Sequence, residues 1–476
     1  MNFEAVIGLE IHIELKTKTK MFSRAPIDFK AEPNTLVTPI DLALPGTLPL
    51  VNKKAVIFAI RVSNALHMKI DHLIRFDRKN YFYSDLPKGY QITQDRYPIG
   101  SEGYIDLEVE DKIKRVRIQR LHLEEDTAKQ LHIGNETLID YNRAGIPLIE
   151  IVTYPDIRSG KEASSYIEKI RQIVTFSDVS DGKMEEGSLR CDVNISLRPY
   201  GATTFGEKVE IKNLNSISNV EKAINLEIKR QEKILLKGEK VIAETRRYDD
   251  SIKDTVSMRS KDETIDYKYF PETNILPIKL SDAFVNEAIA TCPELADKKK
   301  KRYIEEYSLS DYDADILLLD KYNAAYFDEA VKFTSFYKTL SNWVTVEIAT
   351  YLNSEQICIS DFPIEPKRIA LLVNLIESGD VSNKQARDIF TIMLNSTDEP
   401  LNIAKTHNLM QISDENLILE TIRIVLKENK GAIEDYRAGK DRAFGFLIGK
   451  IMGKSRGKFN PTLTSKLLKQ EIDKNE

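Results

Sequence analysis

The stretch Val6–Leu15 reads VIGLEIHIEL and alternates between apolar and polar residues. Side chains of a β-strand point alternately to opposite faces, so one face is apolar and the other carries Glu10, His12 and Glu14. The apolar face predicts a strand that packs on a hydrophobic core. The polar face is either solvent-exposed surface or a group of metal ligands, and both interpretations are open at this point.

The same alternation recurs along the first part of the chain. It is found in RVRIQRLHLEE (115–125), SLRCDVNISLRP (188–199) and KVEIKN (208–213). Helical periodicity interrupts these strands at 161–177 and 219–237. This order of elements predicts an α+β fold whose first domain is a mostly antiparallel sheet with flanking helices.

The periodicity changes after Thr291, where CPELADKKKKRY begins a helical pattern that continues to the end of the chain. The polar stretch 396–413, which contains Pro400, predicts a linker within this helical part. A chain of 476 residues is long enough for several cores. We therefore predict a β-rich domain over 1–290, an all-α domain over 291–400 and a small all-α tail over 401–476.

The composition is that of an ordinary globular protein, with 42% hydrophobic and 30% charged residues. No apolar run approaches the ~20 residues of a membrane span, and the N-terminus shows no leader pattern. The three cysteines, Cys191, Cys292 and Cys358, are too widely spaced for a disulfide framework or a zinc knuckle. A cytoplasmic protein is expected.

Charge is unevenly distributed, because the segment 440–469 holds eight basic residues against the single acid Asp441. Such a segment in an otherwise acidic chain favours a polyanionic partner, although a solvated helix face is the alternative. The letters GKS at 453–455 resemble the end of a phosphate-binding loop. That loop requires glycine at position 448, which is Ile448 here, so a P-loop is excluded.

Glu150 is the residue that points most directly to a site. It lies in GIPLIEIVTYP, a nearly continuous apolar run that predicts a strand buried on both faces. An unpaired carboxylate there would cost several kcal/mol or take up a proton. Its partner is therefore a cation, either a metal ion or an arginine, and Arg143 is the nearest candidate in the sequence.

The polar faces of the strands together offer a set of oxygen ligands with one imidazole. The set is Glu10, His12, Glu124, Glu125, Glu150 and Glu210. Such ligands suit Mg²⁺, with Mn²⁺ as an alternative, better than zinc. Arg190, Lys208 and Lys212 would supply positive charge for phosphates, and this combination is typical of phosphoryl transfer.

Several long motifs, in order along essentially the full chain, closely resemble the B subunit of bacterial aspartyl/glutamyl-tRNA amidotransferases, the GatB family. They are VIGLEIHIELKTKTKMFS (6–23), FDRKNYFYSDLPKGYQITQ (76–94), RLHLEEDTAK (120–129), YNRAGIPLIEIVTYPDIRS (141–159), KMEEGSLRCDVNISLRP (183–199), EIKNLNS (210–216) and FGFLIGKIMGKSRGKFNP (444–461).

The resemblance implies a two-step reaction on a mischarged tRNA. The family uses ATP to phosphorylate the side-chain carboxylate of Glu-tRNA(Gln) or Asp-tRNA(Asn), and ammonia then displaces the phosphate to give the amide. Ammonia would come from glutamine hydrolysis on a GatA-like amidase, with a GatC-like linker completing a heterotrimer. This chain shows no amidase signature of its own, which agrees with an ammonia-supplying partner.

The resemblance also assigns roles to residues. The catalytic metal ligands would be His12, Glu125 and Glu150, with Glu10, Glu124 and Glu210 at or near a second ion. Arg190 and Lys212 would bind the phosphates of ATP, with Lys208, chosen from the strand pattern, as a further cofactor-binding residue. Lys79 and Lys88 would lie where the ammonia channel opens, with plain surface charge as the alternative. The first domain would be the family's cradle, and the tail would contact the tRNA through Lys450, Lys454, Arg456 and Lys458.

One departure concerns zinc. Many members of the family carry a structural zinc site, but Ser23, Ala25, Thr38 and Asp41 stand at the positions of its cysteines. We therefore expect ATP and Mg²⁺ as cofactors and no zinc. Two other functions use the same residues: a tRNA-binding scaffold without catalysis, and a metal-dependent phosphoesterase that needs neither ATP nor a partner.

Overall fold

The structure is a computed structural model that describes all residues except 1, 111, 261–265, 413, 456 and 475–476. Contacts within the chain divide it into two compact units, residues 1–296 and 297–476. Strands lie in the first unit and helices fill the second, so the predicted α+β class is confirmed. Among the described residues, no helix is both long enough and apolar enough to cross a membrane.

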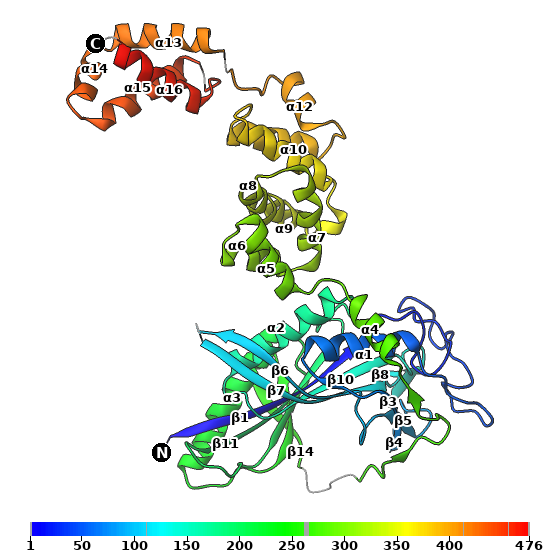
Figure 1. Cartoon of the computed structure of the whole chain (residues 1–476). Coiled ribbons are helices and arrows are strands. Elements are labelled where there is room, and N and C mark those ends of the chain that lie inside the picture. The colour runs from blue at the N-terminus through cyan, green and yellow to red at the C-terminus, as the bar shows by residue number, and fades with distance from the viewer. Residues whose placement is uncertain (1, 111, 261–265, 413, 456, 475–476) are drawn as a thin grey trace. The chain divides into compact units, whose positions relative to one another are not determined.

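A nine-stranded sheet forms the centre of the first unit (Figure 1). Its spatial order is β14 (Asp254–Ser260), β13 (Glu244–Asp249), β12 (Val209–Lys212), β11 (Leu189–Pro199), β1 (Phe3–Glu14), β10 (Pro147–Thr153), β7 (Lys112–Glu125), β6 (Gly100–Val109) and β2 (Lys69–Ile70). Neighbouring strands are antiparallel apart from the parallel pair β12 and β13. The opening motif VIGLEIHIEL therefore lies in a central strand.

One face of the sheet is covered by three helices, α1 (Lys53–Ala65), α2 (Gly160–Phe176) and α3 (Ile217–Leu236) (Figure 1). The apolar residues of β1, including Ile7, Ile11 and Ile13, are fully buried in this core. The polar face of the same strands is left for the site. The alternation in the sequence thus separates the core from the site within single strands.

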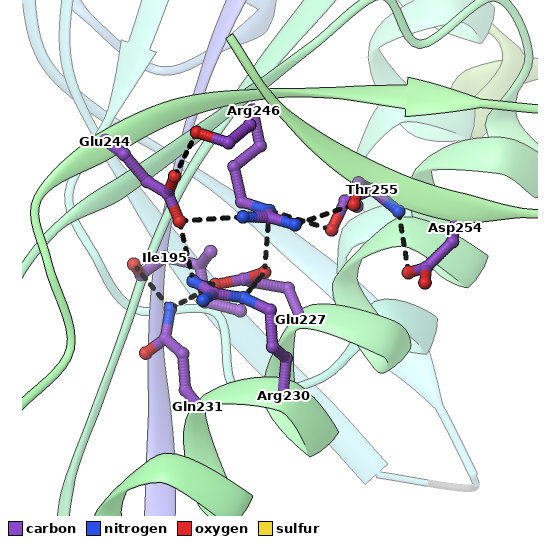
Figure 2. A network of polar contacts seen from close by, with 9 residues as sticks. Ile195, Glu227, Arg230, Gln231, Glu244, Arg246, Asp254 and Thr255 are labelled. Atoms are coloured by element: carbon purple, nitrogen blue, oxygen red, sulfur yellow. Dashed lines mark hydrogen bonds and ion pairs between the residues drawn. The ribbon is translucent and has the colours of Figure 1, made fainter. Parts of the chain in front are cut away.

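Helix α3 shows how the sheet is held to its helices. Its buried stripe Val220, Ala223, Ile224 has the spacing of an amphipathic helix, and Glu227 continues that stripe at 0% exposure. Arg230 pairs with the Glu227 carboxylate at 2.7 Å, and Arg246 of β13 lies 3.7 Å from it (Figure 2). A buried carboxylate needs such partners, so this network fixes β13 against α3.

Shorter elements complete the first unit. A three-stranded sheet consists of β15 (Phe270–Pro271), β4 (Asp77–Asn80) and β5 (Tyr90–Thr93), and β5 contacts β7. Beyond Leu121 the end of β7 has no β6 partner, and its Leu123 amide donates instead to the Gln94 side chain at 3.0 Å. The remaining elements are β3 (Leu73–Ile74), β8 (Lys129–Ile133), β9 (Glu136–Asp140), β16 (Ile278–Lys279) and α4 (Asp282–Ala290).

The second unit is built from helices joined by short loops. They are α5 (Ala296–Tyr307), α6 (Asp311–Leu317), α7 (Lys321–Ala330), α8 (Tyr337–Asn342), α9 (Ala349–Glu355), α10 (Pro366–Glu377), α11 (Asn383–Met393), α12 (Pro400–Thr406), α13 (Glu415–Glu428), α14 (Lys430–Arg437), α15 (Asp441–Lys454) and α16 (Pro461–Lys474). Short 3₁₀ turns cover Val331–Phe333 and Ile359–Asp361, and a π-helical turn covers Trp343–Ile348.

The stretch 396–413, expected as a linker, contains helix α12, which starts at Pro400. Proline is favoured at the first helical position, where no backbone N–H is needed, so this proline begins a helix. Helices α13 to α16 nevertheless share a hydrophobic cluster of their own, centred on residues such as Ile422, Leu447 and Leu468. The division of the helical part near residue 400 stays a prediction.

Candidate active site

Strand register brings the first group of site residues together. His12 of β1 lies opposite Glu150 of β10, and Glu150 lies opposite His122 of β7. His12 Nε2 is 3.4 Å from Glu150 Oε2 and 3.5 Å from Glu124 Oε1. One ligand atom each from His12, Glu124 and Glu150 lie within 4.8 Å of one another, which makes this triad a candidate metal site.

Burial and charge shift the pKa values in this triad strongly. Burial alone would raise the pKa of Glu150, but the neighbouring His122 and His12 rings outweigh it and hold the pKa well below the usual range. Burial alone would lower the pKa of His122, but Glu150 and Glu124 raise it to about 9. The pKa of His12 is raised for the same reason. In the metal-free protein, protonated imidazoles therefore balance the carboxylates.

A second group lies on the next strands of the same face. Glu10 of β1 is opposite Asp192 of β11, and Glu210 of β12 is opposite Asn194. One carboxylate oxygen each from Glu10, Asp192 and Glu210 lie within 4.8 Å of one another, which makes a second candidate metal site. Lys212 Nζ contacts Asp192 at 2.6 Å and Glu210 at 3.2 Å, and so supplies the local positive charge.

Both groups line one cavity of about 320 Å³ whose walls are mainly polar. Arg120, Lys79 and Lys212 contribute cations to the lining, and Tyr267 and Tyr269 contribute aromatic rings. Four buried polar atoms on or beside these walls have no hydrogen-bond partner within the described part of the chain. They are His122 Nδ1, Arg120 Nε, Arg190 Nε and Asn194 Oδ1. Unpaired buried polar atoms of this kind indicate a site built for a charged ligand.

A second, less polar pocket of about 290 Å³ adjoins the first and shares Glu10 with it. Its lining includes Gly8, Pro155, Phe205 and Lys208. Since Glu10 belongs to the second carboxylate group, a ligand in this pocket could reach that group directly. The pocket has the mixed character of a site for a molecule with an apolar ring and a charged end.

Glu125, expected from the resemblance to be a metal ligand, lies apart from the triad. Its carboxylate contacts Lys88 Nζ and accepts a hydrogen bond from the Ile92 amide at 3.0 Å. The cause is strand alternation, because Glu124 shares the face of His122 whereas Glu125 points the other way. Glu124, which the resemblance placed near a second ion, takes the position beside His12 and Glu150.

The structure also resolves the alternative partner of Glu150. Arg143 contacts Asp126 and Glu14, the latter at 3.0 Å, and the ion pairs of Glu150 are with histidines instead. Glu14 is thus held by Arg143 and is not free surface. Arg190 Nη2 also binds Asp126, at 2.8 Å, while its Nε atom has no partner within the described residues.

The remaining predicted residues fall in different places. Lys79 lines the main cavity, whereas Lys88 is engaged with Glu125. Lys450, Lys454 and Lys458 are exposed on or just after α15, and Lys454 contacts Glu428 at 2.9 Å. Arg456 lies outside the described residues.

The cavity lining also contains residues that the sequence analysis did not select, among them His122, Asp192, Tyr267 and Tyr269. The first two share a strand face with chosen residues, so the alternation marked the face but not their proximity to the ligands. Tyr267 and Tyr269 lie in a short segment after β14, and nothing in their local sequence marks them as neighbours of the ligands. Only the fold brings them to the cavity.

The chain resembles known proteins along its whole length. A family model described as the GatB/GatE catalytic domain matches residues 5–286, and one described as the GatB domain matches residues 325–472. The chain is 49% identical to the B subunit of the aspartyl/glutamyl-tRNA(Asn/Gln) amidotransferase of Staphylococcus carnosus (strain TM300), over the full length of both chains. It is equally similar to the protein of the same name from Staphylococcus aureus (strain JH9), again over both full lengths.

Proposed function

This chain belongs to the GatB family, and we propose that it activates and amidates the side-chain carboxylate of mischarged Glu-tRNA(Gln), Asp-tRNA(Asn) or both. The products are Gln-tRNA(Gln) and Asn-tRNA(Asn). The reaction type is that of a ligase that forms a carbon–nitrogen bond with glutamine as amido donor. The observation that carries the proposal is the meeting of two carboxylate groups and three cations in one polar cavity.

The residues present fit a divalent metal. Carboxylate oxygens with one imidazole are hard ligands of the kind that Mg²⁺ and Mn²⁺ accept. His12, Glu124 and Glu150 would hold one ion, and Glu10, Asp192 and Glu210 a second. A bound ion supplies positive charge against the phosphates and the carboxylate, which otherwise repel each other.

The less polar pocket is suited to the nucleoside part of ATP. The Phe205 ring and Pro155 offer apolar contact for a base, and Gly8 leaves its side of the wall free of a side chain. Glu10 marks the point where this pocket meets the main cavity, so the triphosphate would extend past it. Lys212, in the wall of the main cavity, would neutralise phosphate charge, and Arg190 of β11 would assist it. Lys208 lines the less polar pocket and would lie at the nucleoside end.

The chemistry explains why ATP is required. A carboxylate resists attack by an amine because its leaving group would be oxide. Transfer of the γ-phosphoryl group to a carboxylate oxygen releases ADP and gives an acyl phosphate. Ammonia then attacks the acyl carbon, and phosphate leaves with the C–O electron pair. The cavity's task is to position both substrates and neutralise charge.

Ammonia must arrive from outside this chain. The relatives are each named as the B component of an amidotransferase, which indicates that their enzyme has further subunits. We propose a GatA-like glutaminase and a GatC-like linker as partners of this chain. Lys79 lies in the wall of the cavity and would meet ammonia at its entrance. Lys88, paired with Glu125, would lie behind that entrance.

A zinc-free loop is also proposed. Ser23 Oγ accepts a hydrogen bond from the Ala25 amide, and Asp41 Oδ2 accepts from the Thr38 amide and hydroxyl at 2.7 and 2.8 Å. Asp41 also pairs with the buried Lys20 at 3.6 Å. These contacts support a loop held by side chains, and elemental analysis should find no stoichiometric zinc in the purified chain. Cytoplasmic location stays a prediction.

Reconstitution tests the proposed function. The chain is combined with a GatA-like and a GatC-like subunit and supplied with Glu-tRNA(Gln), ATP, Mg²⁺ and glutamine, and formation of Gln-tRNA and ADP is measured. We expect Glu150→Gln to lose product formation by at least about 100-fold, because the proposed metal ion loses a charged ligand. Glu108→Gln, an exposed change on β6, is the matched control and should leave activity unchanged.

Other outcomes distinguish the alternatives. tRNA binding without ADP or product would indicate a scaffold, and cleavage of nucleic acid without ATP would indicate a phosphoesterase. Full activity of Glu150→Gln would contradict the metal assignment.

A further inference from the structure

Four tyrosine rings form a continuous row beside the cavity. The ring centroids of Tyr83 and Tyr81 are 6.0 Å apart, those of Tyr81 and Tyr267 5.9 Å, and those of Tyr267 and Tyr269 6.1 Å. Each pair meets edge to face. We call Tyr83, Tyr81, Tyr267 and Tyr269 the tyrosine row.

The row runs from solvent to the candidate metal ligands. Tyr83 is 53% exposed, and Tyr81 and Tyr267 are partly buried. Tyr267 and Tyr269 line the same cavity as Glu150 and His12. None of the four rings belongs to the hydrophobic core cluster described for this unit, so core packing does not account for the row.

Cations are interleaved with these and neighbouring rings. Lys79 Nζ lies 4.8 Å from the Tyr267 ring centroid and 5.7 Å from that of Tyr81. In the same region, the Arg78 guanidinium lies 4.0 Å from the Tyr90 ring, and Arg75 lies above another tyrosine. Aromatic rings with interleaved cations are the surface on which unpaired nucleotides stack, with the backbone neutralised alongside.

We propose that the tyrosine row binds the unpaired nucleotides at the 3′ end of the aminoacyl-tRNA. This inference rests on the proposed function, because that function places a tRNA-linked carboxylate in the cavity. The aminoacyl group is attached to the last nucleotide, so the single strand must reach the metal ligands from outside. The row is continuous with the cavity and has the Lys79 ammonium over two of its rings, which favours RNA over an apolar protein segment.

The four rings would contact different nucleotides of the 3′ end. Tyr269 and Tyr267, in the cavity wall, would stack against the terminal nucleotides, and Tyr81 and Tyr83 would receive those that precede them. Lys79 would neutralise a phosphate between them. Stacking requires a flat ring and not a hydroxyl group, so phenylalanine should replace these tyrosines and leucine should not.

Binding of uncharged tRNA to the reconstituted complex, without ATP, tests this. Two RNA probes are used: full-length tRNA, and the same tRNA without its unpaired 3′ nucleotides. We expect Tyr267→Leu and Tyr269→Leu each to weaken binding of full-length tRNA by about fivefold or more and to leave binding of the truncated tRNA unchanged. Tyr267→Phe and Tyr269→Phe should restore wild-type binding of the full-length tRNA.

Controls distinguish a specific loss of 3′-end binding from misfolding and from failure of the proposed function. Tyr200→Leu changes a tyrosine that is 79% exposed in the same unit but outside the row, and it should bind both RNAs normally. Equal losses for both RNAs, no loss for either, or failure of phenylalanine to rescue would overturn the proposal. Because binding is measured without chemistry, an inactive wild-type complex that still shows this pattern would refute the proposed function alone.

Discussion

Replacing Glu150 by glutamine should change the protonation of both neighbouring histidines. Glu150 Oε2 lies 3.1 Å from His122 Nε2 and 3.4 Å from His12 Nε2. It is only 9% exposed, so solvent screens these contacts weakly. Glutamine keeps the shape of the side chain and removes its charge. The imidazoles then retain the cost of burial but lose their principal counter-charge.

The magnitude follows from His122, whose pKa is raised to about 9 from 6.5. Burial is the largest influence and lowers this pKa, and the Glu150 charge is the largest of those that raise it. Without Glu150 the pKa should fall, and the whole rise from 6.5 to about 9 corresponds to on the order of 3 kcal/mol. Glu124 remains nearby and limits the fall.

The free energy of unfolding of the metal-free protein should depend on pH through the same rise in the His122 pKa. A pKa raised on folding means that the protonated ring stabilises the metal-free fold. This contribution is fully present below pH 6.5 and is lost as the pH rises through about 9. The wild-type protein without metal should therefore lose stability across this window, and Glu150→Gln should show a flatter pH dependence there.

The assay is an NMR titration of the metal-free chain with labelled histidines. The chain has six histidines, few enough to assign by single substitutions. Glu108→Gln serves as control and should leave the His122 titration unchanged. If His122 titrates at the same pH in wild type and Glu150→Gln, then Glu150 is not its counter-charge and the description of the triad is wrong.

Three further changes test other parts of the structure. Glu227→Ala should destabilise the fold by about 1–3 kcal/mol in urea denaturation, because Arg230 and Arg246 lose a buried partner but keep Glu244. Exposed Glu239→Ala should be nearly neutral. Phe205→Ala should raise the KM for ATP about tenfold and leave tRNA affinity unchanged. An unchanged KM for ATP would contradict ATP binding in the less polar pocket. Deletion of residues 409–476 removes exposed lysines, so it should raise the KM for tRNA and flatten the salt dependence of that KM. Ammonia-dependent chemistry should persist. An unchanged KM would contradict tRNA contact by the tail.

The alternation of the strands predicted which side chains leave the core. VIGLEIHIEL has period two, so His12 and Glu10 had to share a face opposite Ile11 and Ile13. Alternation does not say which strand lies next to which. The contact of His12 with Glu150 depends on pairing between β1 and β10, which are far apart in the chain, and only the fold supplies it.

Glu124 and Glu125 show the same limit of prediction from alternation, here for two adjacent residues. Adjacent acids at the end of a strand are distinguished only if the alternation continues to that end. Strand β7 does continue to Glu125, so Glu124 faces His12 and Glu125 faces Lys88. The resemblance had named Glu125 as a ligand, and the strand geometry favours its neighbour.

The most direct test of the proposed metal centre is a crystal structure of the reconstituted enzyme with Mn²⁺ and a non-hydrolysable ATP analogue, measured at the manganese absorption edge. We predict one anomalous peak among His12, Glu124 and Glu150, and a second among Glu10, Asp192 and Glu210. The base of the analogue should lie against Phe205. Peaks at Glu125, or no peak at either group, would contradict the proposed metal centre.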